Sequence, residues 1–232
     1  MRSRDLDLTQ YNTDKIASGY LRWYDPILQP LVHSEVRLLE LGVHEGGSLR
    51  LWRDYFQRGV VAGIDLRIPE DLAGEERIRV FKGNQSDTAF LSRVAGEVAP
   101  GGFDVIIDDA SHVASLTRTA FWHLFENHLK PSGIYVIEDW GTGYWDDWPD
   151  GRSSRSGRSP WRSLRLAVAR HTGLGKVPIP THGYGMVGFV KELVDEQGAA
   201  DRTRANFSGK PLRASRFESM TITPAIVFIT KR

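Results

Sequence analysis

Apolar residues along the chain fall into compact runs and into helically spaced positions. The compact runs are rich in Val, Ile and Leu and are bounded by polar residues, Gly or Pro; they are 36–41, 60–64, 78–81, 103–107 and 134–137. Runs of this length and composition are typical of buried parallel strands. Two further runs, 217–222 and 226–230, flank a Thr-Pro-Ala turn and predict a terminal antiparallel hairpin.

Between the runs, apolar side chains recur every three or four residues, as Leu49, Trp52 and Phe56 do. Helices are also expected over 163–169 and 185–194, whereas polar residues 198–215 are predicted to form a loop. Alternation of strands and helices predicts an α/β fold. Its sheet would have seven strands, mostly parallel, with helices on both faces and the hairpin at one end.

The N-terminal segment, residues 1–35, is predicted to be helical. Thr13 is an N-cap candidate for a helix that carries Tyr20 and Tyr24 at helical spacing. Pro26 is expected to end that helix or to start another. These two tyrosines and Tyr11 are interpreted mainly as core or docking residues, with contact of one of them to a ligand as the less favoured alternative.

Two acidic stretches follow neighbouring runs of the pattern. Asp-Asp-Ala-Ser-His at 108–112 follows the run 103–107, and Glu-Asp-Trp at 138–140 follows the run 134–137. Ligands of open α/β sheets bind at the edge where parallel strands end. If the two strands are adjacent, about 5 Å apart, four carboxylates and one imidazole share a small space. A hard divalent cation would compensate that charge, so the pattern favours a cation site over the alternative of simple helix caps.

A glycine-rich turn follows the first strand, in the sequence Glu40-Leu-Gly-Val-His-Glu-Gly-Gly-Ser48. Strand, glycine turn and helix form the usual context of a nucleotide-like ligand, but Gly-x-Gly-x-x-Gly is absent, which disfavours a diphosphate. Asp65 ends the second strand, the position from which an acid binds a ribose diol in Rossmann-like sites. Gln85 and Asp87 follow the third strand, where an adenine contact and a helix cap are equally favoured.

Composition excludes several classes of function. The chain has 232 residues, which fits a single α/β domain over 1–232. Its net charge of +1 gives no reason to expect nucleic acid or an anionic membrane as partner. The absence of cysteine excludes thiolate metal sites and cysteine nucleophiles. No signal peptide or membrane span is recognisable, so a cytoplasmic location is expected.

Aromatic residues gather after the second acidic stretch. Trp140, Tyr144 and Trp145 are predicted to contact a substrate, because flat apolar rings beside carboxylates suit sugar rings. Residues 140–182 are therefore interpreted as a substrate lid, with a subunit interface as the alternative.

Four segments together resemble class I methyltransferases, and among them the metal-dependent sugar O-methyltransferases that tailor macrolide antibiotics. That group extends to cephalosporin-hydroxylase-like proteins and to enzymes that methylate sugars of bacterial polysaccharides. The segments are 13–15, 40–48, 108–112 and 138–139, within a resemblance that covers roughly 14–231.

The resemblance implies a Rossmann-like fold, S-adenosylmethionine as methyl donor and a magnesium ion. It implies Asp109, Glu138 and Asp139 as magnesium ligands and His112 as general base. It also implies that Asp65 holds the ribose and that the turn after the first strand binds the amino-acid side. The full set of cofactor-binding candidates is Glu40, Gly42, Gly46, Ser48, Asp65, Gln85, Asp87 and Asp108. For Asp108 the expected role is a hydrogen bond to a helix or to the backbone.

The expected reaction is methyl transfer to a sugar hydroxyl of a glycoside, an oligosaccharide or a glycosylated natural product. The acceptor hydroxyl would bind the metal, which would lower the pKa of that hydroxyl. His112, as the general base, and Asp109 are the expected catalytic residues. One rival is a non-haem iron hydroxylase, in which Asp109, His112 and a second histidine bind iron. A non-catalytic nucleoside-binding module and a nicotinamide dehydrogenase are the others. The family and the aromatic residues lead us to expect a homodimer.

Overall fold

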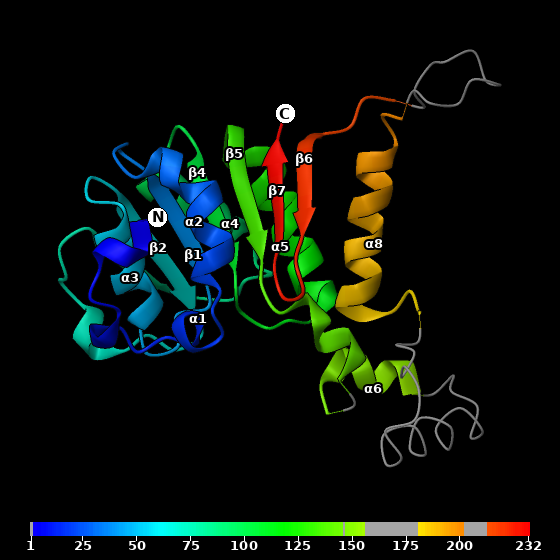
Figure 1. Ribbon diagram of the computed structural model, residues 1–232, viewed down its shortest axis with the longest axis horizontal. Coiled ribbons are helices and arrows are strands. Elements are labelled where there is room, and N and C mark those ends of the chain that lie inside the picture. Colours follow the sequence, from blue (N-terminus) through cyan, green and yellow to red (C-terminus); the bar gives the residue numbers. More distant parts are fainter. Residues whose placement is uncertain (1, 146, 156–180, 202–212) are drawn as a thin grey trace.

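A computed structural model describes residues 2–145, 147–155, 181–201 and 213–232, which Figure 1 traces in chain order. Within these residues seven strands form one sheet in the order β3-β2-β1-β4-β5-β7-β6. They are β1 (Arg37–Leu41), β2 (Val60–Asp65), β3 (Ile78–Lys82), β4 (Phe103–Asp108), β5 (Leu129–Ile137), β6 (Phe217–Ile222) and β7 (Val227–Lys231). The pairs from β3 to β5 are parallel, and β7 is antiparallel to both β5 and β6. The predicted mostly parallel sheet with a terminal antiparallel hairpin is therefore confirmed.

Helices cover both faces of this sheet. The described helices are α1 (Asp14–Ala17), α2 (Leu21–Leu28), α3 (Gly47–Tyr55), α4 (Thr88–Val98), α5 (Ala114–Asn127), α6 (Pro149–Arg155) and α8 (Gly185–Gly198). Short 3-10 turns are η1 (Arg2–Asp5), η2 (Leu8–Gln10), η3 (Gln29–Leu31), η4 (Glu70–Leu72) and η5 (Trp140–Tyr144). No helix among the described residues combines the length and the apolar character needed to cross a bilayer.

Two apolar cores result from the alternation of strand side chains. Leu39 and Ile106 belong to a core that includes residues of α4, α5 and α8, whereas Leu38 and Val105 belong to a second core with α2 and α3. Figure 1 shows α2 crossing in front of β1, while α5 lies behind β5 and β7. The strands are thus buried on both faces, which explains why their sequences are continuous apolar runs.

The structure corrects two predicted boundaries. The single helix expected after Thr13 is two helices, because Gly19 has a φ of +67° between α1 and α2, and Pro26 lies inside α2 rather than at an end. The apolar spacing after the run 103–107 predicts a helix that still includes Leu129, but Leu129 begins β5, since the N–H of Phe103 already pairs with the carbonyl of His128 at 2.7 Å. The helix expected over 185–194 is confirmed as α8, and the one over 163–169 lies outside the described residues.

The sheet order brings the functional loops to one edge. β1 lies between β2 and β4, and β4 lies between β1 and β5. In the register of these strands Leu41 is opposite Asp108, and Asp108 is opposite Ile137. The residues that follow therefore leave the sheet side by side, so the adjacency assumed for the two acidic stretches is confirmed.

Candidate active site

A cleft of about 890 Å³ lies at the carboxyl ends of the parallel strands. Loops after β1, β2, β3, β4 and β5 form its walls together with residues that precede and begin α1. The predicted site residues that line it are Gly42, Ser48, Asp65, Gln85, Asp109, His112 and Asp139. Those that do not line it are Glu40, Gly46, Asp87, Asp108, Glu138, Trp140, Tyr144 and Trp145.

Gly42 allows two of these loops to touch. Its φ is +92°, and a Cβ at this position would lie 2.2 Å from the carbonyl oxygen of Asp109. A side chain would therefore need both a strained backbone and a displaced acidic loop. Gly46, with φ of +80°, precedes α3 in the left-handed conformation and lies against Leu72 instead of the cleft.

Asp65 organises the loop that follows β1. Its Oδ2 accepts hydrogen bonds from the backbone N–H of Val43 at 2.8 Å and of His44 at 3.2 Å, and its Oδ1 accepts one from Arg67 at 3.0 Å. Burial by itself would raise the pKa of Asp65, but these N–H donors hold it below the ordinary value. The result is an ionised carboxylate on the cleft wall, the chemistry that a ribose diol requires.

Gln85 joins the floor of the cleft to Asp108. Its amide nitrogen donates to Oδ1 of Asp108 at 3.2 Å, and its amide oxygen accepts the N–H of Ser111 at 3.1 Å. Burial raises the pKa of Asp108 to about 6. Asp87, in contrast, caps α4 by accepting the N–H of Phe90 at 3.0 Å. Of the two interpretations of Asp87, the structure thus shows the helix cap.

Asp109, His112 and Asp139 form a compact group in which one ligand atom from each lies within 4.8 Å of the others. The Nε2 atom of His112 is 3.7 Å from Oδ1 of Asp109 and 3.9 Å from Oδ2 of Asp139. His112 and Asp139 both have φ near +50°, which is uncommon for residues other than glycine. Carboxylate oxygens beside an imidazole fit a divalent cation of the magnesium or manganese type.

The structure does not bring Glu138 into this group. Its side chain is 1% exposed, and its Oε1 accepts hydrogen bonds from Nζ of Lys15 at 2.8 Å and from the hydroxyl of Tyr24. Burial raises the pKa of Glu138, while the nearby ammonium acts in the opposite direction. This carboxylate therefore faces a buried cation of the protein itself.

Lys15 was not among the predicted site residues. Its side chain is fully buried, with Nζ at 2.6 Å from Asp109, 2.8 Å from Glu138 and 3.2 Å from Glu40. Burial alone would lower the pKa of Lys15, but these three carboxylates hold it well above the ordinary value. One permanent ammonium thus partly compensates the charge of the acidic stretches, a role for which the sequence pattern indicated a metal ion alone.

Tyr20 and Tyr24 were interpreted mainly as core or docking residues, and that interpretation was incomplete. The hydroxyl of Tyr20 donates to Oδ1 of Asp139, and burial together with this hydrogen bond raises its pKa, so it remains a donor. Tyr24 packs in the core against Trp52 at 4.9 Å between ring centroids. The segment 13–15 quoted in the resemblance, followed by tyrosines at helical spacing, is the signal that would have found these residues.

The aromatic residues after Asp139 lie beside the group and not in the cleft. The indole N–H of Trp140 donates to the carbonyl of Thr223 at 2.9 Å, and Trp145 is 49% exposed. Trp148, which belongs to the predicted lid, donates its indole N–H to the carbonyl of His112 at 3.1 Å. Residues 156–180 of the predicted lid lie outside the described residues.

Comparisons with known proteins identify the relatives of this chain. No protein-family model matches it. It is 35% identical over 207 residues to demethylmacrocin O-methyltransferase from Streptomyces fradiae, which covers 78% of this chain and 51% of that protein. It is 41% identical over 158 residues to mycinamicin VI 2''-O-methyltransferase from Micromonospora griseorubida, covering 62% of this chain and 38% of that protein. This chain is a homologue of sugar O-methyltransferases.

The structure of one homologue extends over most of this chain. MycE methyltransferase from the mycinamycin pathway, solved in complex with Mg and SAH, superposes with a TM-score of 0.62 at 31% identity. The match covers 90% of this chain and 48% of that protein, so the chain spans about half the length or less of the relatives compared. A putative caffeoyl-CoA O-methyltransferase from Staphylococcus aureus, 16% identical over 98% of this chain and 96% of that one with a TM-score of 0.53, shares the fold alone. The expected Rossmann-like methyltransferase fold and the stated resemblance are therefore confirmed.

Proposed function

We propose that this protein is an O-methyltransferase that depends on S-adenosylmethionine and magnesium and acts on a sugar hydroxyl. The observation that carries the proposal is the group of Asp109, His112 and Asp139 on the wall of the cleft that Asp65 and the β1 loop also line. The homologues named above are O-methyltransferases of sugar-bearing antibiotics, and the MycE complexes contain Mg, SAH and mycinamycin VI. We therefore propose a glycoside, an oligosaccharide or a glycosylated natural product as acceptor.

The cofactor would bind along the loops after β1, β2 and β3. Asp65 would accept hydrogen bonds from the ribose diol, and Ser48 and the backbone at Gly42 would bind the amino-acid end. Gln85 would contact the adenine edge. Glu40 and Asp108 would act behind these residues, because both are buried and neither lines the cleft.

We propose Asp109 and Asp139 as the residues that hold magnesium. When bound, the ion supplies Lewis acidity that lowers the pKa of a nearby hydroxyl. His112 would accept the proton of the acceptor hydroxyl. The methyl group would then be displaced in line, which requires the cleft to align the acceptor oxygen, the methyl carbon and the cofactor sulfur. Glu138, expected from the resemblance to be a third ligand, would instead hold Lys15.

The proposal is tested by separating cofactor binding from turnover. S-adenosylhomocysteine binding measured by calorimetry should survive EDTA, whereas methyl transfer to a panel of glycosides, followed by mass spectrometry, should require magnesium. His112→Ala should lower the transfer rate by about 10² to 10⁴-fold, the usual contribution of a general base, with cofactor affinity retained. Transfer at full rate in EDTA would contradict the metal role, and full activity of His112→Ala would contradict the base.

The site supports neither the iron hydroxylase nor the non-catalytic nucleoside-binding module. A two-histidine, one-carboxylate iron site needs a second histidine, but among the described residues the group contains two aspartates and one histidine. A non-catalytic nucleoside-binding module does not need His112 at 3.7 Å from Asp109. Turnover dependent on iron and a reductant would support the first rival, and the absence of any turnover the second.

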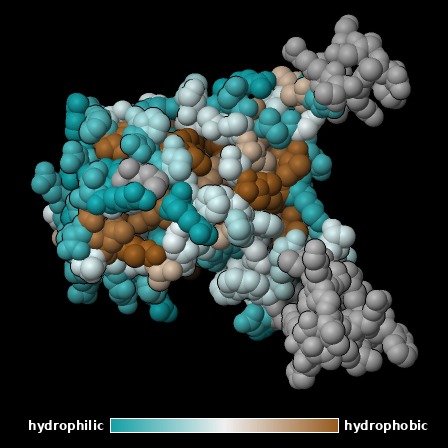
Figure 2. Space-filling view, in the orientation of Figure 1, coloured by the Kyte–Doolittle hydropathy of each residue, from teal (hydrophilic) through white to brown (hydrophobic). Residues whose placement is uncertain are grey.

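The remaining expectations are part of the same proposal. We propose a single methyltransferase domain over 1–232 with an N-terminal helical segment over 1–35; the lid expected over 140–182 remains a prediction, because most of it lies outside the described residues. A cytoplasmic location and a homodimer remain predictions, as does the lack of a nucleic-acid or membrane partner. Exposed apolar side chains among the described residues are scattered over different elements, and Figure 2 shows apolar and polar residues interspersed on the face it displays.

A further inference from the structure

Each carboxylate of the proposed cation site is held from outside through one of its two oxygens. Oδ2 of Asp109 accepts a hydrogen bond from Nζ of Lys15 at 2.6 Å, while its Oδ1 lies 3.7 Å from Nε2 of His112. Oδ1 of Asp139 accepts a hydrogen bond from the hydroxyl of Tyr20, while its Oδ2 lies 3.9 Å from the same nitrogen. In both cases the oxygen that is not held is the one directed toward His112.

This division has a physical consequence for ligand geometry. A carboxylate rotates about its terminal bond, so an isolated aspartate offers either oxygen in many directions. A hydrogen bond to one oxygen fixes the rotation and leaves the other oxygen in one place. Two carboxylates fixed in this way place their free oxygens around the same atom, Nε2 of His112, at 3.7 and 3.9 Å. Residues that orient metal ligands in this way affect the affinity for the ion without touching it.

The donors come from a segment that is itself anchored at the cleft. Thr13 caps α1 by accepting the N–H of Lys15, and the carbonyl of Asn12 lies so close to Gly47 that a Cβ there would be 1.9 Å from it. Tyr24 is fully buried and donates its hydroxyl to Glu138. The segment 12–24 is thus packed between α3 and the ends of β4 and β5.

We propose that the N-terminal segment 12–24 is a structural part of the cation site, in which Tyr20 is a positioning residue for Asp139 and Lys15 for Asp109. The inference rests on the proposed cation site and goes beyond it. It assigns roles to Lys15 and Tyr20, which do not line the cleft and are not proposed as metal ligands. Tyr20 carries the sharper test, since replacing it by Phe removes only a hydroxyl, whereas replacing Lys15 also changes the charge.

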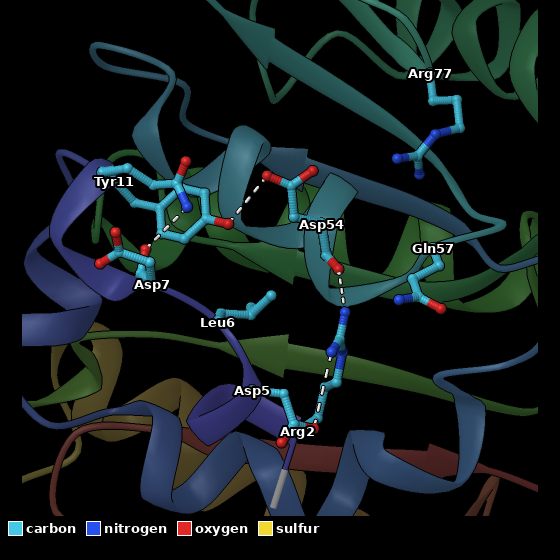
Figure 3. Close-up of a pocket in the computed structure, with 9 residues that line it drawn as sticks. Arg2, Asp5, Leu6, Asp7, Tyr11, Asp54, Gln57 and Arg77 are labelled. Atoms are coloured by element: carbon cyan, nitrogen blue, oxygen red, sulfur yellow. Dashed lines mark hydrogen bonds and ion pairs between the residues drawn. The ribbon is translucent and has the colours of Figure 1, made fainter.

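Tyr11 provides a matched control. Its hydroxyl donates to Oδ2 of Asp54 at 3.0 Å, so it forms the same phenol–aspartate pair as Tyr20. Figure 3 shows this pair in a separate pocket lined by Arg2, Asp7 and Arg77, none of which lines the cleft. Tyr11→Phe therefore removes a phenol–aspartate hydrogen bond that lies in a different pocket from the cation group.

The experiment uses Mn²⁺ alone as the probe, with free Mn²⁺ measured by electron paramagnetic resonance for the whole chain. Tyr20→Phe should weaken Mn²⁺ binding by about 10-fold or more, the usual effect of losing an outer hydrogen bond to a metal ligand, whereas Tyr11→Phe should leave it unchanged. S-adenosylhomocysteine binding in EDTA should be the same in both variants. In an Asp139→Asn background, Tyr20→Phe should have no additional effect, because the two residues act through one hydrogen bond.

The outcomes separate the inference from the proposed function. If Asp109→Asn binds Mn²⁺ as tightly as the unmodified chain, the cation site fails and the inference fails with it. If Asp109→Asn loses binding but Tyr20→Phe does not, the cation site stands and the positioning role is overturned. Equal losses in Tyr20→Phe and Tyr11→Phe, or additive losses with Asp139→Asn, would also overturn it.

Discussion

Replacement of Lys15 by methionine is expected to be among the most destabilising single changes in this protein. The methionine fills a similar volume but removes the ammonium, which has no exposed surface and lies 2.6 to 3.2 Å from three carboxylates. Glu40 and Glu138, both at most 1% exposed, would then remain buried without a cation. Removing one partner of a buried ion pair typically costs about 3 to 5 kcal/mol, because the other charge is left uncompensated.

Lys130 provides a comparison at a partly exposed ion pair. Its Nζ lies 2.7 Å from Asp104, almost the separation between Lys15 and Asp109, but the two side chains are 35% and 24% exposed. Exposed pairs contribute about 0 to 1 kcal/mol, so Lys130→Met should have little effect. The two variants therefore remove ammonium groups with ion pairs of similar length that differ in solvent access and in the number of carboxylates, three at Lys15 and one at Lys130.

Urea denaturation of both variants in EDTA, at neutral pH, measures the difference. We expect the free energy of unfolding to fall by at least about 2 kcal/mol more for Lys15→Met than for Lys130→Met. Divalent cation should restore part of the loss, because it would then replace the missing charge. Equal losses in the two variants would refute the reasoning, since they would mean that Lys15 is not a buried counter-ion.

Two further predictions concern the cation ligands and a second ion-pair cluster. Asp109→Asn should weaken Mn²⁺ binding about 10-fold more than Glu138→Gln. Equal losses of Mn²⁺ affinity in the two variants would mean that Glu138 is a metal ligand after all. Arg213 and Arg216 bond to Glu196 and hold its pKa below the ordinary value, against the effect of burial. Because the folded pKa is depressed, Glu196 stabilises the fold above pH about 4.5 and loses this effect as the pH falls. Glu196→Gln should thus lower the free energy of unfolding, measured by urea denaturation, by roughly 1 to 3 kcal/mol at pH 7 and by less at pH 3. A loss of stability that does not depend on pH would contradict the ion-pair origin.

The strands and the site edge could be predicted because they depend on local patterns. Runs such as 60–64 and 103–107 are buried on both faces of the sheet, so their apolar character is continuous and unmistakable. Acidic residues directly after two such runs have to leave the sheet at its carboxyl edge, and the register of β4 and β5 places them side by side. The placement of Asp109 and Asp139 at this edge therefore followed from sequence position and strand direction, whereas their role as metal ligands was implied by the family resemblance.

The partners of those acids depended on the tertiary structure. Tyr20 reaches Asp139 across 119 residues and Lys15 reaches Glu138 across 123, and no spacing along the chain encodes either pair. A lysine in a short helix and a tyrosine at helical spacing have the same local pattern whether they face solvent, a core or a carboxylate. The sequence thus determined which groups lie at the sheet edge, while chain packing decided which of their oxygens are held and which remain free to bind a cation.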